Sequence, residues 1–180
     1  MVYVFLANGF EEVEALAPVD FLRRCELEVK TIGIGGEVVT GAHGITVKAD
    51  ISEYELNEYE NATAVVLPGG MPGTLNLENS ETVQDFVSYA EQEGLPICAI
   101  CAAPSILGHR GLLDGKRATC FPGFENELGG ATYTGESVEC DGNIITGKGA
   151  GVALEFAHAI GKVLAPEKAD TVRDSMQCRK

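Results

Sequence analysis

The sequence predicts an α/β fold in which a mostly parallel central sheet is covered by helices on both faces. Short β-rich runs alternate with stretches of helical spacing, which is the pattern of βαβ units. Two of these runs, Ala64–Leu67 and Pro96–Ile100, are almost continuously apolar, as expected for parallel strands buried on both faces. The chain has 180 residues, of which 45% are hydrophobic, and it shows neither a repeat nor a linker. These features are typical of a single domain over residues 1–180.

In the N-terminal half, the elements are predicted from apolar spacing and from the turns that flank them. Val2–Ala7 is a β-rich run that stops at the turn dipeptide Asn8-Gly9. Apolar residues then recur at helical spacing over Glu11–Arg24, and Pro18 is expected to kink or disturb this helix. The other predictions for this half are strands over Glu28–Ile34, Val38–Val39, Ile45–Val47 and Ala64–Leu67, and a helix over Ser80–Gln92 with Ser80 as its N-cap.

The C-terminal half continues the same alternation. The strand Pro96–Ile100 leads directly into a helix predicted over Ala103–Leu113. Asp141-Gly142 is the strongest hairpin signal of the chain. It joins strands predicted over Ser137–Cys140 and Asn143–Thr146, and an apolar-faced helix over Val152–Leu164 follows. Because sheets of this type bind ligands at the carboxyl ends of their strands, the site is expected there.

The charge of the chain limits the classes of partner that we expect it to bind. The formal net charge is −14, and no cluster of Lys or Arg interrupts it, so neither a nucleic acid nor an anionic membrane is an expected partner. The first apolar run is too short for a signal peptide and lacks a basic lead, and no later stretch approaches the ~20 apolar residues of a membrane span. We therefore expect a cytoplasmic protein whose six cysteines are free thiols rather than a disulfide framework.

Cys101 falls where a buried strand turns directly into a helix. A sharp turn of this kind presents its side chain outward, as in a nucleophile elbow. The unpaired N–H groups at a helix start favour a thiolate over a thiol. The N–H of Ala102 and the Gly69-Gly70 turn after the neighbouring strand are placed to donate to an oxyanion. The sequence thus predicts Cys101 as a reactive nucleophile.

The proton partner of this cysteine is predicted to be an acid. His109 lies about two helical turns beyond Cys101, roughly 12 Å along the axis, which is too far for a hydrogen bond. His43 falls in the predicted hairpin and His158 inside the last helix, where structural or solvent-facing roles are the simpler interpretation. Three acids follow the first strand, and the pattern alone does not choose among them: Glu11, Glu12 and Glu14.

Two other cysteine chemistries fit less well. Cys98 and Cys101 form a C-x-x-C pair, but both cysteines of a thioredoxin-type dithiol lie at or just beyond a strand end. Cys98 lies inside the apolar run, where an inert core thiol is expected. No second pair of Cys or His has the spacing of zinc ligands, so neither a metal nor a cofactor is predicted.

Four segments together resemble the ThiJ/PfpI superfamily, in the branch of the parkinsonism-associated protein deglycase and the bacterial YajL proteins. They are Ala7–Arg24, Val65–Leu77, Ile97–Leu107 and Ile145–Ile160. The resemblance runs nearly from end to end in the same order, and the combination of E-E-x-E, L-P-G-G and A-I-C-A is highly specific. It implies a flavodoxin-like three-layer sandwich that forms a homodimer.

The resemblance also implies roles for residues at matching motif positions. Cys101 matches the reactive cysteine of the family, and Glu14 matches the glutamate that contacts its sulfur. Gly69, Gly70 and Ala102 match the backbone donors around that sulfur. The implied active site is thus the same strand end that the residues themselves indicate.

Other matching positions concern the surroundings of the implied site. Asp20 and Arg24 are placed near the dimer face, and His43 stands where relatives often carry arginine, which implies a weakened anion pocket with Arg24. Ala102 replaces the histidine that follows the cysteine in the protease-like branch, so peptidase action is not expected. Ala131 occupies the place of a histidine in the human-type members, which removes that imidazole from any mechanism.

Two functions of different classes fit these residues. The first is a cofactor-free enzyme for reactive carbonyls, of the glyoxalase or deglycase type, whose substrate is a small aldehyde or a glycated molecule. The second is a redox sensor or stress-protective chaperone whose cysteine oxidises to a sulfinate. Amidase- or protease-like hydrolysis is a third interpretation that rests on fold analogy alone.

Overall fold

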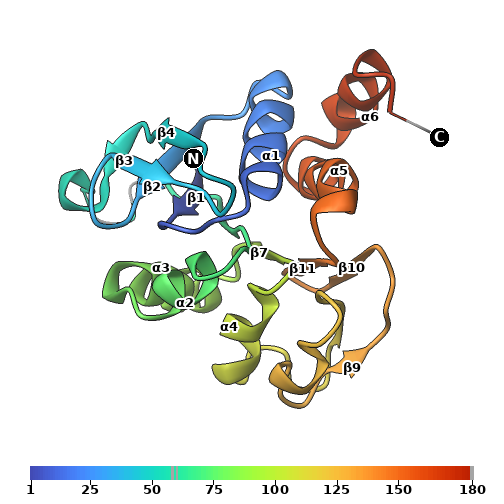
Figure 1. Cartoon of the computed structure of the whole chain (residues 1–180). Helices are drawn as coiled ribbons and strands as arrows, with labels where there is room; N and C mark the ends of the chain where they lie inside the picture. The colour runs from blue at the N-terminus through green and yellow to red at the C-terminus, as the bar shows by residue number, and fades with distance from the viewer. Residues whose placement is uncertain (58, 60, 179–180) are drawn as a thin grey trace.

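The computed structural model describes residues 1–57, 59 and 61–178, which form three layers (Figure 1). The central sheet has seven strands in the order β10-β11-β7-β6-β1-β2-β5. These strands are β1 (Val2–Leu6), β2 (Val29–Gly33), β5 (Ile51–Ser52), β6 (Ala64–Leu67), β7 (Ile97–Ile100), β10 (Val138–Asp141) and β11 (Ile144–Gly147). All neighbouring strands pair in parallel except β10 and β11. The predicted α/β sandwich with a mostly parallel sheet is confirmed.

Helices cover both faces because successive side chains of each strand point to opposite sides. One core joins Val4 of β1 to α1 (Glu12–Arg24), α5 (Ala153–Leu164) and α6 (Pro166–Ser175). The other core joins Phe5 of β1 to α2 (Gly73–Glu78), α3 (Glu81–Gln92) and α4 (Pro104–His109). Each large apolar side chain that is fully buried here stabilises the fold by about 1.5–3 kcal/mol.

Smaller elements complete the chain. A two-stranded antiparallel ribbon, β3 (Val38–Thr40) and β4 (Thr46–Lys48), stands beside the main sheet, as predicted around Gly41–Gly44. The remaining elements are β8 (Arg117–Ala118), β9 (Thr132–Tyr133) and the 3-10 turns η1 (Glu53–Glu55), η2 (Glu125–Glu127) and η3 (Ala150–Val152). The predicted Asp141-Gly142 hairpin joins β10 to β11, and Gly142 takes a φ of +63° there.

Several predicted boundaries differ from the structure. Helix α4 ends at His109 rather than Leu113, because the chain turns at Gly111 with a φ of +72°. Pro18 lies buried within α1, and the helix continues past it to Arg24. Helices α2 and α6 were not predicted, since neither carries a long apolar repeat. Ser80 is the N-cap of α3 as predicted, and its side chain accepts a hydrogen bond from the Val83 N–H at 3.3 Å.

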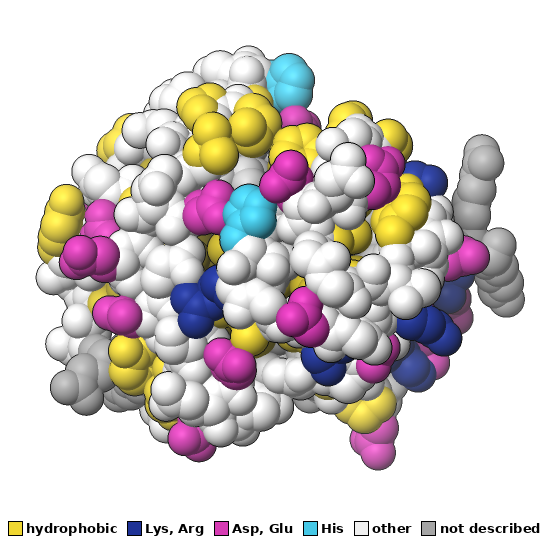
Figure 2. All heavy atoms as spheres, turned by 90° about the horizontal axis from the view of Figure 1, so that it is seen from below, with side chains coloured by type: hydrophobic (Ala, Val, Ile, Leu, Met, Phe, Trp, Pro, Cys, Tyr) yellow, Lys and Arg dark blue, Asp and Glu magenta, His cyan; other side chains and the backbone are white. Residues whose placement is uncertain are grey.

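The surface agrees with the acidic composition. Figure 2 shows one face of the molecule, on which Asp and Glu side chains are scattered and Lys and Arg side chains stand in small separate groups. Among the described residues, no helix is both long enough and apolar enough to cross a membrane.

Candidate active site

Cys101 lies at the carboxyl end of β7 in a strained turn. Its φ of +66° is in the left-handed region, which costs a residue with a side chain roughly 1–2 kcal/mol. Two backbone hydrogen bonds hold the turn. The Cys101 N–H donates to the Gly147 carbonyl at 2.9 Å, and the Cys101 carbonyl accepts from the Phe121 N–H at 2.8 Å. This is the geometry of a nucleophile elbow, with the thiol half-buried.

Glu14 reaches the same point from the first turn of α1. Its side chain is fully buried, and its carboxyl group contacts the Cys101 thiol by a side-chain hydrogen bond. The Gly69 N–H donates to Glu14 Oε2 at 3.0 Å. The other oxygen, Oε1, is buried and has no hydrogen-bond partner among the described residues. A buried carboxyl group with a spare oxygen is suited to carry a proton.

The two groups perturb each other. Burial raises the pKa of Glu14 to about 7, although hydrogen bonds from Cys101 and the Gly69 N–H act in the opposite direction. Burial, and then the charge and hydrogen bond of Glu14, raise the pKa of Cys101 to about 12. The pair therefore gives up its first proton near neutral pH and shares the remaining proton over a wide range above it.

The sequence led us to expect that N–H groups at the helix start favour the thiolate, and at Cys101 their effect is outweighed by burial and by Glu14. Helix α4 begins at Pro104 and has only six residues, so it adds little positive potential at the sulfur. The influences that do lower the pKa of Cys101 are the N–H groups of Ala102 and Gly70, which donate to the sulfur. A thiolate at this site consequently requires that Glu14 hold the proton.

The glycine pair after β6 (Ala64–Leu67) is required by this close packing. A Cβ atom on Gly69 would lie 2.6 Å from the Cys101 Cβ and 2.7 Å from Glu14 Oε2. Gly70 has a φ of +90°, and a Cβ atom there would lie 2.4 Å from the Glu11 nitrogen. The three predicted backbone donors thus bind different groups. The N–H groups of Gly70 and Ala102 donate to the Cys101 sulfur, and the Gly69 N–H donates to the Glu14 carboxyl group.

Glu12, two residues before Glu14, is held in a different environment. Its side chain points to the loop between β3 and β4, where Oε1 accepts from the backbone N–H of His43 at 2.9 Å and of Ile45 at 3.3 Å. Burial acts to raise the pKa of Glu12, but the hydrogen bonds from His43 and the backbone lower it to about 2. Of the acids after β1, Glu14 is therefore the one at the sulfur, and Glu12 is a permanently charged structural anchor.

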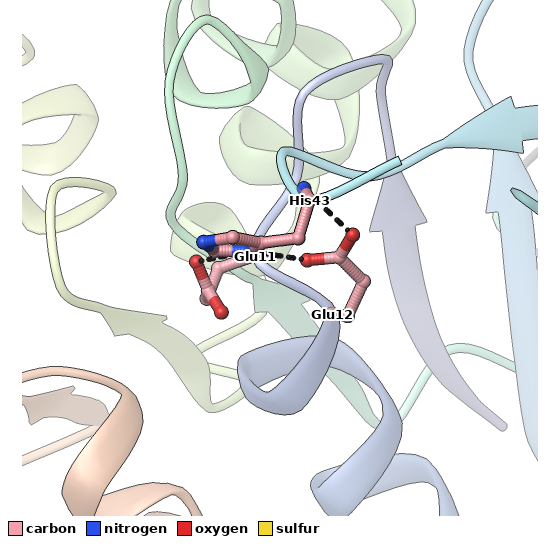
Figure 3. A group of neighbouring side chains, drawn as sticks. All are labelled: Glu11, Glu12 and His43. Carbon is pink, nitrogen blue, oxygen red and sulfur yellow. Dashed lines mark hydrogen bonds and ion pairs between the residues drawn. The ribbon is translucent and has the colours of Figure 1, made fainter. Parts of the chain in front are cut away.

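His43 lies between two of these acids, as Figure 3 shows. Its Nδ1 atom is 3.0 Å from Glu12 Oε2 and 3.5 Å from Glu11 Oε2, and these carboxylates raise its pKa. The ligand atoms of the three side chains lie within 4.8 Å of one another, as a metal site requires. Both oxygens of Glu12 already accept hydrogen bonds, however. We assign the cluster as a clamp that fixes the β3–β4 loop to the start of α1.

The remaining predicted residues do not reach the sulfur in this way. Asp20 and Arg24 form an exposed ion pair one turn apart on α1, with Oδ2 and Nε 2.9 Å apart. Arg24 pairs with Asp20, and His43 pairs with Glu12. Both basic side chains of the implied anion pocket are therefore already paired with carboxylates. Ala131 is half-buried and packs against the core on the α4 side of the sheet.

Two more residues, Phe121 and Gly149, form part of the site. The Phe121 N–H donates a hydrogen bond to the Cys101 carbonyl, and Phe121 is 47% exposed. A Cβ atom on Gly149 would lie 3.2 Å from that ring and 3.9 Å from Glu14 Oε1. The absence of a side chain at Gly149 therefore leaves space beside the spare carboxyl oxygen. Phe121 belongs to no motif with a chemical meaning, so the sequence offered no signal for it, whereas Gly149 lies in Ile145–Ile160, one of the segments that carry the family resemblance.

Comparisons with known proteins agree with this geometry. The model of the DJ-1/PfpI family matches residues 1–162. The chain is 37% identical to the protein dj-1beta of Drosophila melanogaster over 90% of this chain and 88% of that protein. It is 33% identical to a deglycase of Pyrococcus abyssi over 91% of this chain and 98% of that protein. The crystal structure of Drosophila melanogaster DJ-1beta superposes with a TM-score of 0.93, at 34% identity over 99% and 98% of the two chains.

Some relatives are longer. The chain spans 46% and 36% of the length of the DJ-1 homologues A and B of Arabidopsis thaliana, to which it is 35% and 36% identical. The deglycase of Pyrococcus abyssi and the Drosophila melanogaster DJ-1beta structure nevertheless match it almost from end to end. The order of motifs, the strained cysteine turn and the family match together confirm the resemblance, and the chain belongs to the DJ-1/PfpI family.

Proposed function

We propose that this chain, acting as a single domain over residues 1–180, is a cysteine-dependent and cofactor-free enzyme for reactive carbonyls, of the deglycase or glyoxalase type. The observation that carries this proposal is the buried contact between Glu14 and Cys101, with the N–H groups of Ala102 and Gly70 donating to the sulfur. Relatives named deglycases in two Pyrococcus species support the substrate class, which is a small aldehyde or a glycated molecule.

The first step is addition to a carbonyl group. As the Cys101 sulfur bonds to the aldehyde carbon, its proton passes to the Glu14 carboxylate and the carbonyl electron pair moves to oxygen. The N–H groups of Ala102 and Gly70 are then close enough to stabilise this oxyanion, a contribution for which one donor is typically worth 10²–10³ in rate. Glu14 returns the proton to the oxygen, which gives a hemithioacetal.

The second step moves a proton between the two substrate carbons. The Glu14 carboxylate removes the C–H proton of the hemithioacetal carbon, and the hydroxyl proton of that carbon passes to the neighbouring carbonyl oxygen, which gives an enediolate. Glu14 then delivers the C–H proton to the neighbouring carbon, which leaves a thioester of a hydroxy acid. Water then cleaves the C–S bond and restores the thiol, so aldehyde and water together give the hydroxy acid. A pKa of about 7 for Glu14 suits a group that must both accept and donate at neutral pH.

The test is lactate formation from methylglyoxal by protein free of metal and glutathione. Cys101→Ser and Glu14→Gln are each expected to lower the rate by at least about 10²-fold. Cys98→Ser, which changes the other cysteine of the same strand, should retain turnover. Release of methylglyoxal from its adduct with N-acetylcysteine tests the deglycase form of the reaction in parallel. Absence of both activities in the wild-type protein refutes the enzymatic proposal.

A redox-sensing or chaperone role is the alternative that a specific observation favours. Glu14 Oε1 is buried with no hydrogen-bond partner among the described residues, so a protonated Glu14 could donate to the oxygen of a Cys101 sulfinate. Peroxide titration with mass spectrometry tests this role. Sulfinate at Cys101 alone supports it, whereas uniform oxidation of several cysteines refutes it. Amidase- or protease-like hydrolysis has no comparable support, because Ala102 follows the cysteine where the protease-like branch has histidine.

We also propose a cytoplasmic homodimer. Helices α1 and α5 lie side by side, and apolar side chains on them are well exposed: Val13 is 50% exposed, Leu16 38%, Leu154 40% and Val163 53%. Exposed apolar side chains that gather into one patch mark interaction surfaces. Asp20 and Arg24 are exposed on α1 as well. Sedimentation velocity at micromolar concentration should give the mass of two chains, and Leu16→Glu should shift it toward one.

A further inference from the structure

An open cavity of about 600 Å³ lies at the carboxyl edge of the sheet and contains none of the residues of the Cys101 site. It is formed where the ends of β1 and β2 meet η1 and the link between α2 and α3. Its volume is in the range of small-molecule pockets, about 300–1,000 Å³. Its place at the strand ends is also where ligands bind in sheets of this kind.

The walls of this cavity are braced by one carboxylate. Glu53 of η1 accepts the Gly35 N–H through Oε1 at 2.7 Å and the Thr82 hydroxyl through Oε2 at 2.9 Å. The end of β2, the turn η1 and the first residues of α3 are therefore tied together without a ligand. Both oxygens of Glu53 are used in this way, so the residue is a support for the cavity.

Two side chains that line the cavity have hydrogen-bond donors to spare. Asn8 is fixed by its Oδ1 atom, which accepts the Thr40 N–H at 2.9 Å, and its NH₂ group has no partner among the described residues. Ser80 is fixed by its Oγ atom, which accepts the Val83 N–H at 3.3 Å, and its hydroxyl hydrogen remains available. Each group is thus held by one hydrogen bond and has a second one to offer.

Two further side chains present acceptors by the same arrangement. Asn76 donates through Nδ2 to the Asn8 carbonyl at 2.8 Å, and Asn79 donates through Nδ2 to the Leu75 carbonyl at 2.8 Å. Their Oδ1 atoms have no partner among the described residues. Because Asn76 and Asn79 are three residues apart at the end of α2, they lie on one side of the helix.

The charge of the lining selects against anions. Of the described residues that line the cavity, none is Lys, Arg or His, and two are acids, Glu53 and Glu81. The apolar part of the lining includes Ala7, Ile34 and the ring of Tyr54, which is 79% exposed. The cavity therefore offers neutral donors and acceptors beside an open aromatic ring.

We propose that this cavity binds a neutral, hydroxyl-rich ligand of about monosaccharide size. A hydroxyl group donates and accepts at once, so neighbouring hydroxyls of a sugar match the two donors and two acceptors of the wall. The C–H face of a sugar ring is apolar and suits the ring of Tyr54. This binding uses neither Cys101 nor Glu14 and is independent of the carbonyl chemistry proposed above.

The probes are methyl α-D-glucopyranoside, methyl β-D-ribofuranoside and myo-inositol, none of which has a free carbonyl group to react with Cys101. Each is titrated into the full chain by calorimetry and by amide chemical shifts, with inorganic phosphate as the anionic comparison. At least one polyol should bind with a Kd near or below about 1 mM, a strength in keeping with a small polar ligand. It should shift the amides of Gly35 and Ser80, and phosphate should not.

Asn8→Asp is the decisive variant. The new carboxylate still accepts the Thr40 N–H, so the fold contact is kept while the free NH₂ donor of this lining residue is replaced by an acceptor. Affinity for the polyol should fall at least about tenfold. Asn126→Asp makes the same change of charge at an exposed position outside the cavity and should leave affinity unchanged. No binding of any polyol up to about 20 mM, equal affinity in Asn8→Asp, or phosphate shifting the same amides would each overturn the proposal.

Discussion

Cys98 lies within β7 and Cys101 lies in the turn that follows it, three residues later, and their environments are opposite. Cys98 is fully buried within β7, where it pairs in register with Val66 of β6 and Ile145 of β11. Burial raises the pKa of its thiol far above the ordinary value. Cys101 is half-buried in a left-handed turn and shares a proton with Glu14. The C-x-x-C spacing is therefore a coincidence of strand and turn.

The difference shows that reactivity at this site is a property of the backbone and of one acid. Helix α4 contributes little to lowering the pKa of Cys101. The N–H groups of Ala102 and Gly70 lower it instead by donating hydrogen bonds to the sulfur. Cys98 has no counterpart of Glu14, since only burial and the more distant Cys140 act on its pKa. Experiments that treat the two cysteines alike should thus give different answers.

The largest expected difference is in alkylation by iodoacetamide. At pH 8, Cys101 should react at least about 10²-fold faster than Cys98, because the thiolate is the nucleophile and Cys98 has no acid to take its proton. The rate at Cys101 should rise as pH passes about 7, where the pair loses its first proton, and then level off. Peptide mapping by mass spectrometry over pH 5–9 measures both rates.

Glu14→Gln sharpens this experiment. The amide cannot accept the thiol proton, so the rise near pH 7 should vanish and reactivity should increase only at higher pH. Glu167→Gln, at an exposed position of α6, should leave the profile unchanged. An inflection near pH 7 that persists in Glu14→Gln would assign the titration to another group and separate Glu14 from the chemistry.

Much of this arrangement could be predicted from the sequence. The order of strands and helices was recovered because parallel strands buried on both faces leave long apolar runs, as at Ala64–Leu67. Cys101 was found because a strand that runs straight into a helix places one residue at the turn. Helix α2, from Gly73 to Glu78, was missed because six residues with one glycine carry no clear period.

The choice among the acids could not be made from the sequence without the family resemblance. Glu12 and Glu14 are both buried and lie in the same turn of α1, yet one has a pKa of about 2 and the other of about 7. The cause is contact with segments far away in the chain, the β3–β4 loop for Glu12 and the Gly69 turn for Glu14. Such contacts depend on the tertiary fold and leave no local pattern.

The second difference is in the pH dependence of stability. The pKa of Glu14 in the folded protein, about 7, lies above its ordinary value of 4.5, so the folded protein binds this proton more tightly than the unfolded chain. The stabilisation is fully present below pH 4.5 and is lost as pH rises to about 7. The loss in the free energy of unfolding is on the order of 3 kcal/mol. Among the described residues, no carboxyl group shifts the pKa of the Cys98 thiol. We therefore expect no such loss of stability from the surroundings of Cys98.

Urea unfolding at pH 4.5 and pH 8 measures this effect. Wild type should lose more stability than Glu14→Gln between the two pH values, because the amide stays neutral throughout. Glu167→Gln should follow the wild type. Equal losses in wild type and Glu14→Gln would mean that folding does not raise the pKa of Glu14.

The smallest expected difference is the most direct test of the strained turn. At Cys101, a φ of +66° strains any residue with a Cβ atom, so Cys101→Gly should be more stable than Cys101→Ala by about 0.5 kcal/mol after the entropic cost of glycine. At Cys98, in the middle of a strand, the order should reverse. Cys98→Gly should be less stable than Cys98→Ala by about 1 kcal/mol, since glycine loses both entropy and a buried methyl group. The four variants are compared by urea unfolding under one condition. The same order of stability at both positions would show that the left-handed turn does not strain Cys101, and the contrast between the cysteines would then rest on Glu14 alone.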